Sequence, residues 1–167
     1  NDGWGSSRVI QPIQGGTYGI VGLGRIGRRV VPMAEGLGMD VVAYDPLLDD
    51  DIFDRMGVEA VSFEGLLNRS DCIAIHAILN HQTYHMFSTG EFKRMKDSAI
   101  LVNVARGPLV DEEALVGAVE HGEIRAAALD VFENEPPADS PVLDCDRIVC
   151  SPHHAGSSPM AKENKIE

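Results

Sequence analysis

Short, almost uninterrupted apolar segments recur along the chain and alternate with longer segments of mixed polarity. A strand that is buried on both faces has no alternating polar positions, so these segments are typical of parallel strands joined by helices. We expect strands at residues 17–21, 40–44, 72–75, 100–104, 126–131 and 148–150, and helices at 25–37, 63–69, 89–95 and 112–121. Asp111 and Gly122 are expected to cap the last of these helices at its two ends.

The first expected strand leads directly into a glycine-rich segment, GIVGLGRIG at residues 19–27. The pattern G-x-G-x-x-G between a strand and a helix is typical of a turn that holds a pyrophosphate. Gly22 allows the tight turn, Gly24 lets the backbone approach the phosphates, and Gly27 lets the helix pack close to the sheet. The N-terminus of the helix then points at the anion.

The second expected strand ends in an acidic residue, Asp45, which lies 18 residues beyond Gly27. A carboxylate there can bind the ribose hydroxyls of an adenine dinucleotide and repels a 2′-phosphate, so NAD is favoured over NADP. The alternative is an ordinary strand-to-helix turn, with Asp45 merely preceding the loop that opens at Pro46. The order of strand, turn, helix, strand and acid favours the first interpretation. It predicts a Rossmann-type doubly wound parallel sheet with helices on both faces.

Length and composition exclude several classes of protein. The 167 residues suit one domain, and the formal net charge of −12 argues against a nucleic-acid surface. No apolar run is long enough to span a membrane, and no signal peptide is visible. Cys72, Cys145 and Cys150 are odd in number and lack C-x-x-C spacing, which fits a reducing cytoplasm. His81 and His85 lack a nearby carboxylate that would complete a ligand set, so we expect no metal site.

Three further segments place a charged or titratable residue just after an expected strand. Arg106 lies in VNVARGPLVD, Glu135 in LDVFENEPP and His153 in SPHHAG. Open α/β sheets bind ligands at the carboxyl ends of their strands, and these three groups can hold a carboxylate substrate and move a proton. Taken singly, Arg106 could be a surface cation, Glu135 part of a solvated turn, and His153 a capping or core residue. Their joint occurrence favours a catalytic site.

Together with the glycine motif, these segments closely resemble the D-isomer-specific 2-hydroxyacid dehydrogenases over residues 15–160. The resemblance implies the NAD-binding domain of an oxidoreductase that interconverts a D-2-hydroxy acid and a 2-keto acid by hydride transfer. Residues 44–46, 70–76 and 79–81 are most similar to the branch that includes D-3-phosphoglycerate dehydrogenase-like enzymes and the C-terminal-binding-protein corepressors. The alternative function is therefore an NAD-sensing, corepressor-like dimerisation module with little or no catalysis.

Two segments depart from the family pattern. Residues 76–80, HAILN, stand where many members have His-x-Pro-Leu-Thr, which leaves the identity of the substrate open. Residues 156–158, GSS, stand where the corepressors carry a tryptophan shortly after the histidine, which favours an enzyme.

The resemblance also implies residue roles. Arg106 is expected to clamp the substrate carboxylate and keto oxygen, and His153 to act as general acid and base at the C2 hydroxyl. Glu135 is expected to hydrogen-bond His153 and favour its charged form. Asp130 is expected to meet the nicotinamide carboxamide. The expected cofactor-binding residues are Gly22, Gly24, Arg25, Ile26, Gly27, Asp45, Ala77, Asn80, Val104, Ala105, Arg106, Asp130, His153 and Gly156.

The domain organisation follows from the same resemblance. We expect an interdomain remnant at residues 1–16, the NAD-binding domain at 17–156, and the start of a truncated C-terminal helix at 157–167. The domain that would bind the small-molecule substrate is expected to be absent from this chain. We also expect a homodimer formed through this domain, with a shared apolar surface drawn from Ile78, Leu79, Met86, Phe87 and Leu109.

Overall fold

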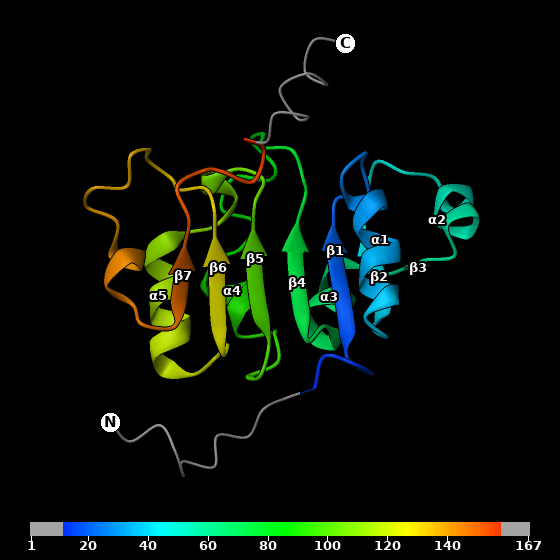
Figure 1. The fold of residues 1–167 in the computed structure, drawn as a ribbon, viewed down its shortest axis with the longest axis horizontal. Helices are drawn as coiled ribbons and strands as arrows, with labels where there is room; N and C mark the ends of the chain where they lie inside the picture. Colours follow the sequence, from blue (N-terminus) through cyan, green and yellow to red (C-terminus); the bar gives the residue numbers. More distant parts are fainter. Residues whose placement is uncertain (1–11, 158–167) are drawn as a thin grey trace.

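The computed structural model describes residues 12–157. Its seven strands form one parallel sheet in the order β3-β2-β1-β4-β5-β6-β7 (Figure 1). The strands are β1 Thr17–Val21, β2 Asp40–Tyr44, β3 Glu59–Ala60, β4 Cys72–Ile75, β5 Ile100–Asn103, β6 Ala126–Leu129 and β7 Ile148–Cys150. The direction of winding reverses between β1 and β4, and open α/β sheets bind ligands beyond the carboxyl ends of the strands at such a point.

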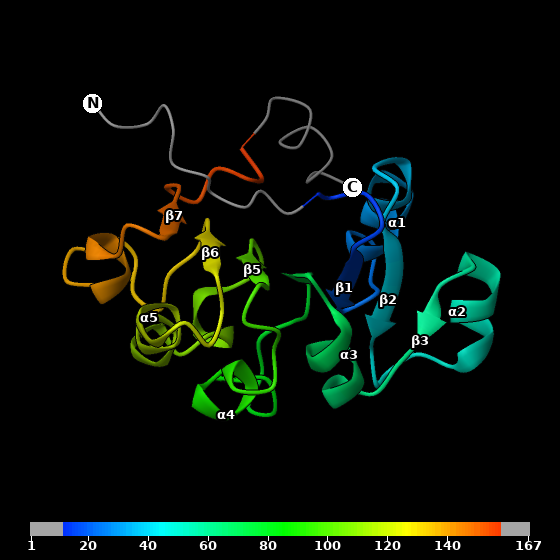
Figure 2. The ribbon, with the colours of Figure 1, turned by 90° about the horizontal axis from the view of Figure 1, so that it is seen from below.

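Helices lie on both faces of the sheet. They are α1 Gly27–Gly36, α2 Asp50–Met56, α3 Phe63–Arg69, α4 Thr89–Phe92 and α5 Glu112–His121, with the short 3₁₀ helices η1 Gly107–Leu109 and η2 Pro141–Asp144. Figure 2 shows α3, α4 and α5 on one face and α1 on the other, beside β1 and β2. The predicted Rossmann-type doubly wound sheet is therefore confirmed.

The structure corrects several predicted boundaries. The strands predicted at 100–104 and 126–131 end earlier, at Asn103 and Leu129, because the chain then turns into loops held by side chains. The helix predicted at 25–37 begins only at Gly27, since residues 24–26 form the turn, and the helix predicted at 89–95 ends at Phe92.

Two elements lacked a clear apolar signal in the sequence. The edge strand β3 has two residues, both exposed, and helix α2 buries only Phe53. Neither element therefore shows the run or the period from which a strand or an amphipathic helix is predicted.

Helix α5 has the ends that the sequence predicts. The side chain of Asp111 accepts a hydrogen bond from the backbone N–H of Ala114, which satisfies a free donor of the first turn. Gly122 closes the helix in the left-handed conformation with φ of 75°. Helix α5 therefore begins and ends at the residues that the sequence predicts.

Two hydrophobic clusters stabilise the sheet, one on each face. The larger lies against α3, α4 and α5 and contains Leu66, Phe92 and Leu115, all with no exposed surface. The smaller lies under α1 and α2 and includes Val31 and Phe53. Both helical layers are thus attached to β1 and β2, where the glycine-rich turn begins.

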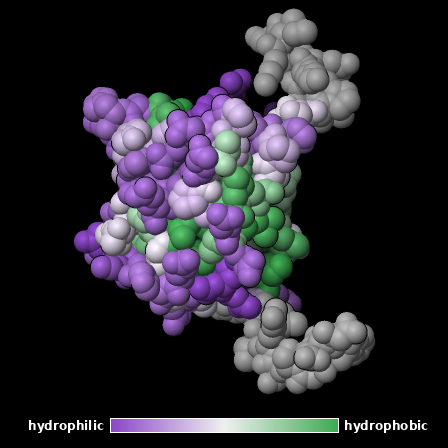
Figure 3. Space-filling view, turned by 90° about the vertical axis from the view of Figure 1, so that its left-hand side faces the viewer, coloured by the Kyte–Doolittle hydropathy of each residue, from purple (hydrophilic) through white to green (hydrophobic). Residues whose placement is uncertain are grey.

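On the face of the sheet where α1 lies, the described residues include no helix over strands β5 to β7. Leu101, Ala127 and Ile148 lie in one row and are buried, whereas Ile100 is 37% and Val149 70% exposed on the opposite face. Seen from the β7 side, hydrophobic residues gather along one border of the molecule (Figure 3). These strands have apolar residues on both faces, as the sequence indicates, although helices cover only one of those faces from β5 to β7.

The structure describes residues 12–16 of the predicted remnant at 1–16 and only residue 157 of the predicted truncated helix at 157–167, and the rest of both segments lies outside the described residues. Within the described residues, no helix has the length and apolar character needed to cross a membrane.

Candidate cofactor and active site

The glycine-rich turn is shaped by close backbone contacts. Gly22 has φ of 93°, and a Cβ added to it would lie 2.7 Å from the backbone nitrogen of Ala77. A Cβ on Gly27 would lie 2.3 Å from the carbonyl oxygen of Gly22. Any larger residue at either position would separate α1 or the Ala77 loop from β1. These two glycines are therefore required by the fold itself.

Gly24 differs from its neighbours, because a Cβ added there would meet no atom of the protein within 4 Å. The packing does not require a glycine at this position. The open space lies at the turn before α1, beside the exposed residues Arg25 and Ile26. An uncrowded backbone before a helix suits a phosphate-bearing ligand, so the turn fits the expected dinucleotide.

Asp45 lies beside this turn. Its Oδ2 accepts a hydrogen bond from the backbone N–H of Leu23 at 2.9 Å, and its Oδ1 accepts one from the N–H of Leu47 at 3.1 Å. The carboxylate is thus fixed next to the glycine turn at the end of β2. A carboxylate in this position can accept hydrogen bonds from ribose hydroxyls.

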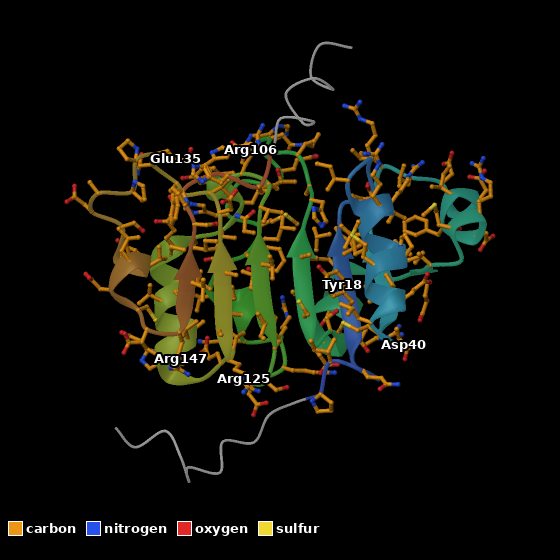
Figure 4. All side chains as sticks on the ribbon, viewed as in Figure 1. Tyr18, Asp40, Arg106, Arg125, Glu135 and Arg147 are labelled. Carbon is orange, nitrogen blue, oxygen red and sulfur yellow. The ribbon has the colours of Figure 1, made fainter. Side chains whose placement is uncertain are left out.

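The three expected catalytic residues lie at one edge of the sheet. Figure 4 shows Arg106 and Glu135 beyond the carboxyl ends of the strands, whereas Arg125 and Arg147 lie at the opposite edge. Arg106 follows β5, Glu135 follows β6, and His153 follows β7. Neighbouring parallel strands therefore bring together residues that are up to 47 positions apart in the sequence.

His153 and Glu135 form a direct pair. The Nδ1 atom of His153 lies 2.8 Å from Oε2 of Glu135, and the other oxygen, Oε1, accepts a hydrogen bond from the N–H of Phe132. The hydrogen bond with His153 holds the pKa of Glu135 below its ordinary value, with help from the Phe132 N–H and the positive charge of Arg106. Because Nδ1 faces Glu135, the second ring nitrogen is left to exchange a proton with a ligand.

A buried asparagine shapes the Arg106 loop. Asn103 has no exposed surface; its Nδ2 donates to the carbonyl oxygen of Arg106 and its Oδ1 accepts from the N–H of Ala105. Both sides of the short loop are therefore tied to the end of β5. The Arg106 side chain itself is exposed and donates to the carbonyl oxygen of Ala105.

Gly107 brings the Arg106 loop into contact with the loop that carries Glu135. A Cβ on Gly107 would lie 1.8 Å from the carbonyl oxygen of Phe132, so the two backbones are in direct contact. Only glycine allows this approach. The contact sets the position of the Arg106 segment relative to the start of the segment that carries Glu135.

Asp130 organises the loop that carries His153. Its Oδ1 accepts from the hydroxyl of Ser151 and the N–H of His154, and its Oδ2 accepts from the N–H of Ala155 at 2.7 Å. Burial raises the pKa of Asp130, but the hydrogen bonds from Ser151, Ala155 and His154 outweigh it and the net shift is downward. The expected contact of Asp130 with nicotinamide therefore stays a prediction, whereas its hydrogen bonds to this loop are present in the structure.

The remaining expected cofactor residues occupy loops at the same edge. Ala77 touches the glycine turn, and Val104 and Ala105 form the loop after β5. Asn80 uses its side-chain oxygen to accept from the N–H groups of Gln82 and Thr83, so it shapes a turn of its own loop. Gly156 is exposed in the loop beyond His153.

Sequence reasoning missed two buried polar residues of this region, Asn103 and Glu112. A usable signal existed for Asn103, because a polar residue that ends an apolar strand immediately before an arginine loop must find partners. No local signal distinguished Glu112 from its exposed neighbour Glu113. Among residues 12–157, no group of three or more His, Cys, Asp or Glu side chains is placed to hold a metal ion.

Comparison with known proteins agrees with this geometry. Residues 1–155 match the family described as D-isomer specific 2-hydroxyacid dehydrogenase, NAD binding domain. The chain is 44% identical over 152 residues to a D-3-phosphoglycerate dehydrogenase of Methanocaldococcus jannaschii, covering 90% of this chain and 29% of the relative. It is also 44% identical over 156 residues to a glyoxylate reductase of Korarchaeum cryptofilum, covering 93% of this chain and 47% of the relative.

Solved structures show the same fold. The NAD complex of a D-isomer specific 2-hydroxyacid dehydrogenase from Lactobacillus delbrueckii ssp. bulgaricus superposes with a TM-score of 0.88 at 29% identity, covering 98% of this chain and 53% of that chain. A glyoxylate reductase from Paecilomyes thermophila gives a TM-score of 0.86 at 35% identity, with 96% and 48% covered.

The fold and the glycine turn thus define an NAD-binding domain of the Rossmann type. The chain belongs to the D-isomer-specific 2-hydroxyacid dehydrogenase family. It spans from 29% to about half of the length of the relatives described above. These relatives are a phosphoglycerate dehydrogenase, glyoxylate reductases and a 2-hydroxyacid dehydrogenase, so the corepressor-like alternative is not favoured.

The shifted pKa of Asp130 gives a prediction about stability. Because its pKa in the folded state lies below the ordinary value of 3.8, its stabilising contribution is complete above pH 3.8 and is lost as the pH falls through the folded-state pKa. We expect Asp130→Asn to lower the free energy of unfolding at pH 7 by roughly 1–3 kcal/mol, since buried hydrogen bonds to a charged group are lost. The variant should also lose less stability than the parent below pH 3.8.

Urea unfolding between pH 2.5 and 7 measures both effects. Asp139→Asn, at an exposed aspartate of the loop before η2, is the control and should behave like the parent. Equal stability of the parent and Asp130→Asn at pH 7 would contradict the role given to Asp130.

Proposed function

We propose that the whole protein is an NAD-dependent oxidoreductase that interconverts a D-2-hydroxy acid and a 2-keto acid. The observation that carries this proposal is the His153–Glu135 pair, which lies at the same carboxyl edge of the sheet as Arg106 and the glycine turn after β1. An acid-base pair next to a fixed cation suits the reduction of a carbonyl group in a carboxylate substrate. NAD supplies the chemistry of hydride acceptance and donation when it is bound.

His153 and Glu135 together handle the proton at the C2 oxygen. In reduction of the keto acid, His153 gives a proton to the C2 oxygen from the ring nitrogen that does not face Glu135, and in oxidation it takes that proton back. Glu135 orients the ring through Nδ1, and its carboxylate oxygen lies 2.8 Å from that nitrogen. The site therefore needs no other proton donor at this atom.

Arg106 binds the substrate. Its guanidinium group is a permanent cation whose planar donors match a carboxylate, and it can also stabilise the charge that develops on the keto oxygen. The side chain is exposed at the edge of the sheet and is therefore accessible to a ligand. Its positive charge also stabilises the ionised carboxylate of Glu135 and thereby contributes to the lowered pKa of that group.

We infer further that the protein is a homodimer that works in the cytoplasm. The three cysteines are free within the described residues, in agreement with a reducing compartment. The apolar dimer surface expected from the sequence needs correction, because Phe87 and Leu109 have no exposed surface and belong to the core. Ile78 at 65% and Leu79 at 39% exposure remain available for such a contact.

The position of Asp45 predicts cofactor preference in the 167-residue chain. We expect NADH to bind more tightly than NADPH, because the carboxylate beside the glycine turn accepts from a free 2′-hydroxyl and repels a 2′-phosphate. Asp45→Ala should reduce this preference about tenfold, which corresponds to roughly 1.4 kcal/mol. Calorimetric titration of both cofactors measures the ratio.

Asp49→Ala is the matched control, because Asp49 follows on the same loop and its side chain makes no capping hydrogen bond. Its preference should equal that of the parent. Equal affinities for NADH and NADPH in the parent, or an unchanged ratio in Asp45→Ala, would overturn the role of Asp45.

Steady-state kinetics of the whole protein test the proposed reaction. We expect His153→Ala to lower kcat for keto-acid reduction by ~10²–10⁴-fold, as is usual for loss of a general acid. Arg106→Ala should raise KM and lower kcat, because the cation acts on both bound substrate and developing charge. Glu135→Gln should move the alkaline limb of the pH-rate profile to lower pH, because the neutral amide no longer places a negative charge beside Nδ1 of the ring.

His154→Ala is the control, since this neighbouring histidine uses only its backbone N–H to bind Asp130. It should retain the activity of the parent. Wild-type turnover of His153→Ala on its best 2-keto acid would show that the proposed mechanism is wrong.

A further inference from the structure

Glu112 is a buried carboxylate that lies outside the site described above. It is the first residue of α5, yet only 6% of its surface is exposed. A residue in the first turn of a helix ordinarily points its charge into solvent, and burial of a carboxylate is costly unless hydrogen bonds compensate for it. The partners of Glu112 therefore indicate what it does.

Those partners lie in the loop between β6 and η2. Oε1 of Glu112 accepts from the N–H of Glu133 at 2.7 Å, and the N–H of Glu112 donates to Oε1 of Glu133 at 3.0 Å. The other oxygen, Oε2, accepts a hydrogen bond from the hydroxyl of Ser140. Glu112 thus binds residues at both ends of the segment 133–140.

This segment carries Glu135, the partner of His153. Its internal backbone hydrogen bonds are local turns, from Ala138 to Pro136 and from Ser140 to Pro137. At its two ends the segment also contacts the rest of the molecule through its backbone, at Glu133 against Gly107 and by a hydrogen bond from the N–H of Leu143 to the carbonyl oxygen of Ser140. Its described side-chain links, beyond those of Glu135 itself, are the bonds of Glu112 and a 3.1 Å contact of Glu133 with Nε2 of His85. Without Glu112 the side-chain bonds at both ends are lost, and the segment has more freedom to move Glu135 away from the imidazole ring.

We propose that Glu112 is a positioning residue for catalysis. Its two carboxylate oxygens accept hydrogen bonds from the two ends of the 133–140 loop and thereby keep the carboxylate of Glu135 within hydrogen-bond distance of Nδ1 of His153. The expected effect of Glu112 on kinetics rests on the proposed function, whereas its expected effect on the position of the loop does not. Glu112 touches neither substrate nor cofactor and acts only through Glu135.

The first test is structural and needs no activity. In a crystal structure of Glu112→Ala, we expect the 133–140 loop to shift and Glu135 to lie beyond hydrogen-bond distance of His153. Glu113→Ala is the matched control, because Glu113 is the exposed next residue of the same helical turn and carries the same charge. It should preserve the pair. A Glu112→Ala structure that keeps the pair at the parental 2.8 Å overturns the proposal.

The second test is kinetic and uses the whole protein. Glu112→Ala should move the alkaline limb of the pH-rate profile in the same direction as Glu135→Gln and lower kcat about tenfold or more, with little change in the affinity for NADH. The double variant should be no worse than Glu135→Gln alone, because both changes remove one contact. A merely structural role would lower thermal stability and leave the pH profile in place, and that result also overturns the proposal.

Two further variants keep the test decisive if Glu112→Ala fails to fold. Glu112→Gln retains an oxygen that accepts from Glu133 and an amide that can donate to Ser140, so it should restore most of the activity. Ser140→Ala removes only the bond at the far end of the loop and should shift the pH profile in the same direction by less. If the unaltered whole protein reduces no 2-keto acid, the proposed function fails, and the crystal structures alone decide the role of Glu112.

Discussion

Two buried polar side chains, at the ends of β5 and β6, fix the backbone of the loops that carry Arg106 and His153. When a strand ends, its last backbone groups lose their sheet partners, and buried groups without partners are costly. Asn103 replaces these partners for the Arg106 loop, and Asp130 does so for the His153 loop. The two loops therefore reach the edge of the sheet in defined conformations, with their charged side chains free to meet a ligand.

Some glycines of these loops are required by backbone packing, whereas Gly24 is not. Gly22, Gly27 and Gly107 each stand where a Cβ would collide with backbone, so the architecture itself excludes larger residues there. Gly24 stands before open space, which leaves room for the backbone to approach a ligand. Close contact at Gly107 also joins the Arg106 loop to the Glu135 loop, so the two loops are held in one position relative to each other.

The sequence predicted the sheet well because the strands depend on local patterns. Apolar runs marked six of the seven strands, and motifs at the strand ends pointed to Arg106, Glu135 and His153, which the structure places at one edge of the sheet. The elements that were missed, α2 and β3, bury too little surface to leave a pattern. The pairing of Glu135 with His153 was expected only from a family resemblance. Glu112 was not foreseen, since its burial depends on a loop more than 20 residues away.

The most direct measurement is a crystal structure of the whole protein with NADH and a substrate-like 2-hydroxy or 2-keto acid. We expect the guanidinium group of Arg106 to bind the carboxylate of the ligand. The ring nitrogen of His153 that does not face Glu135 should lie within hydrogen-bond distance of the C2 oxygen. The His153–Glu135 pair and the loops tied to Asn103 and Asp130 should keep the geometry seen here. A ligand bound away from Arg106 and His153, or loops rearranged so that the pair is broken, would show that the roles proposed for these residues are wrong.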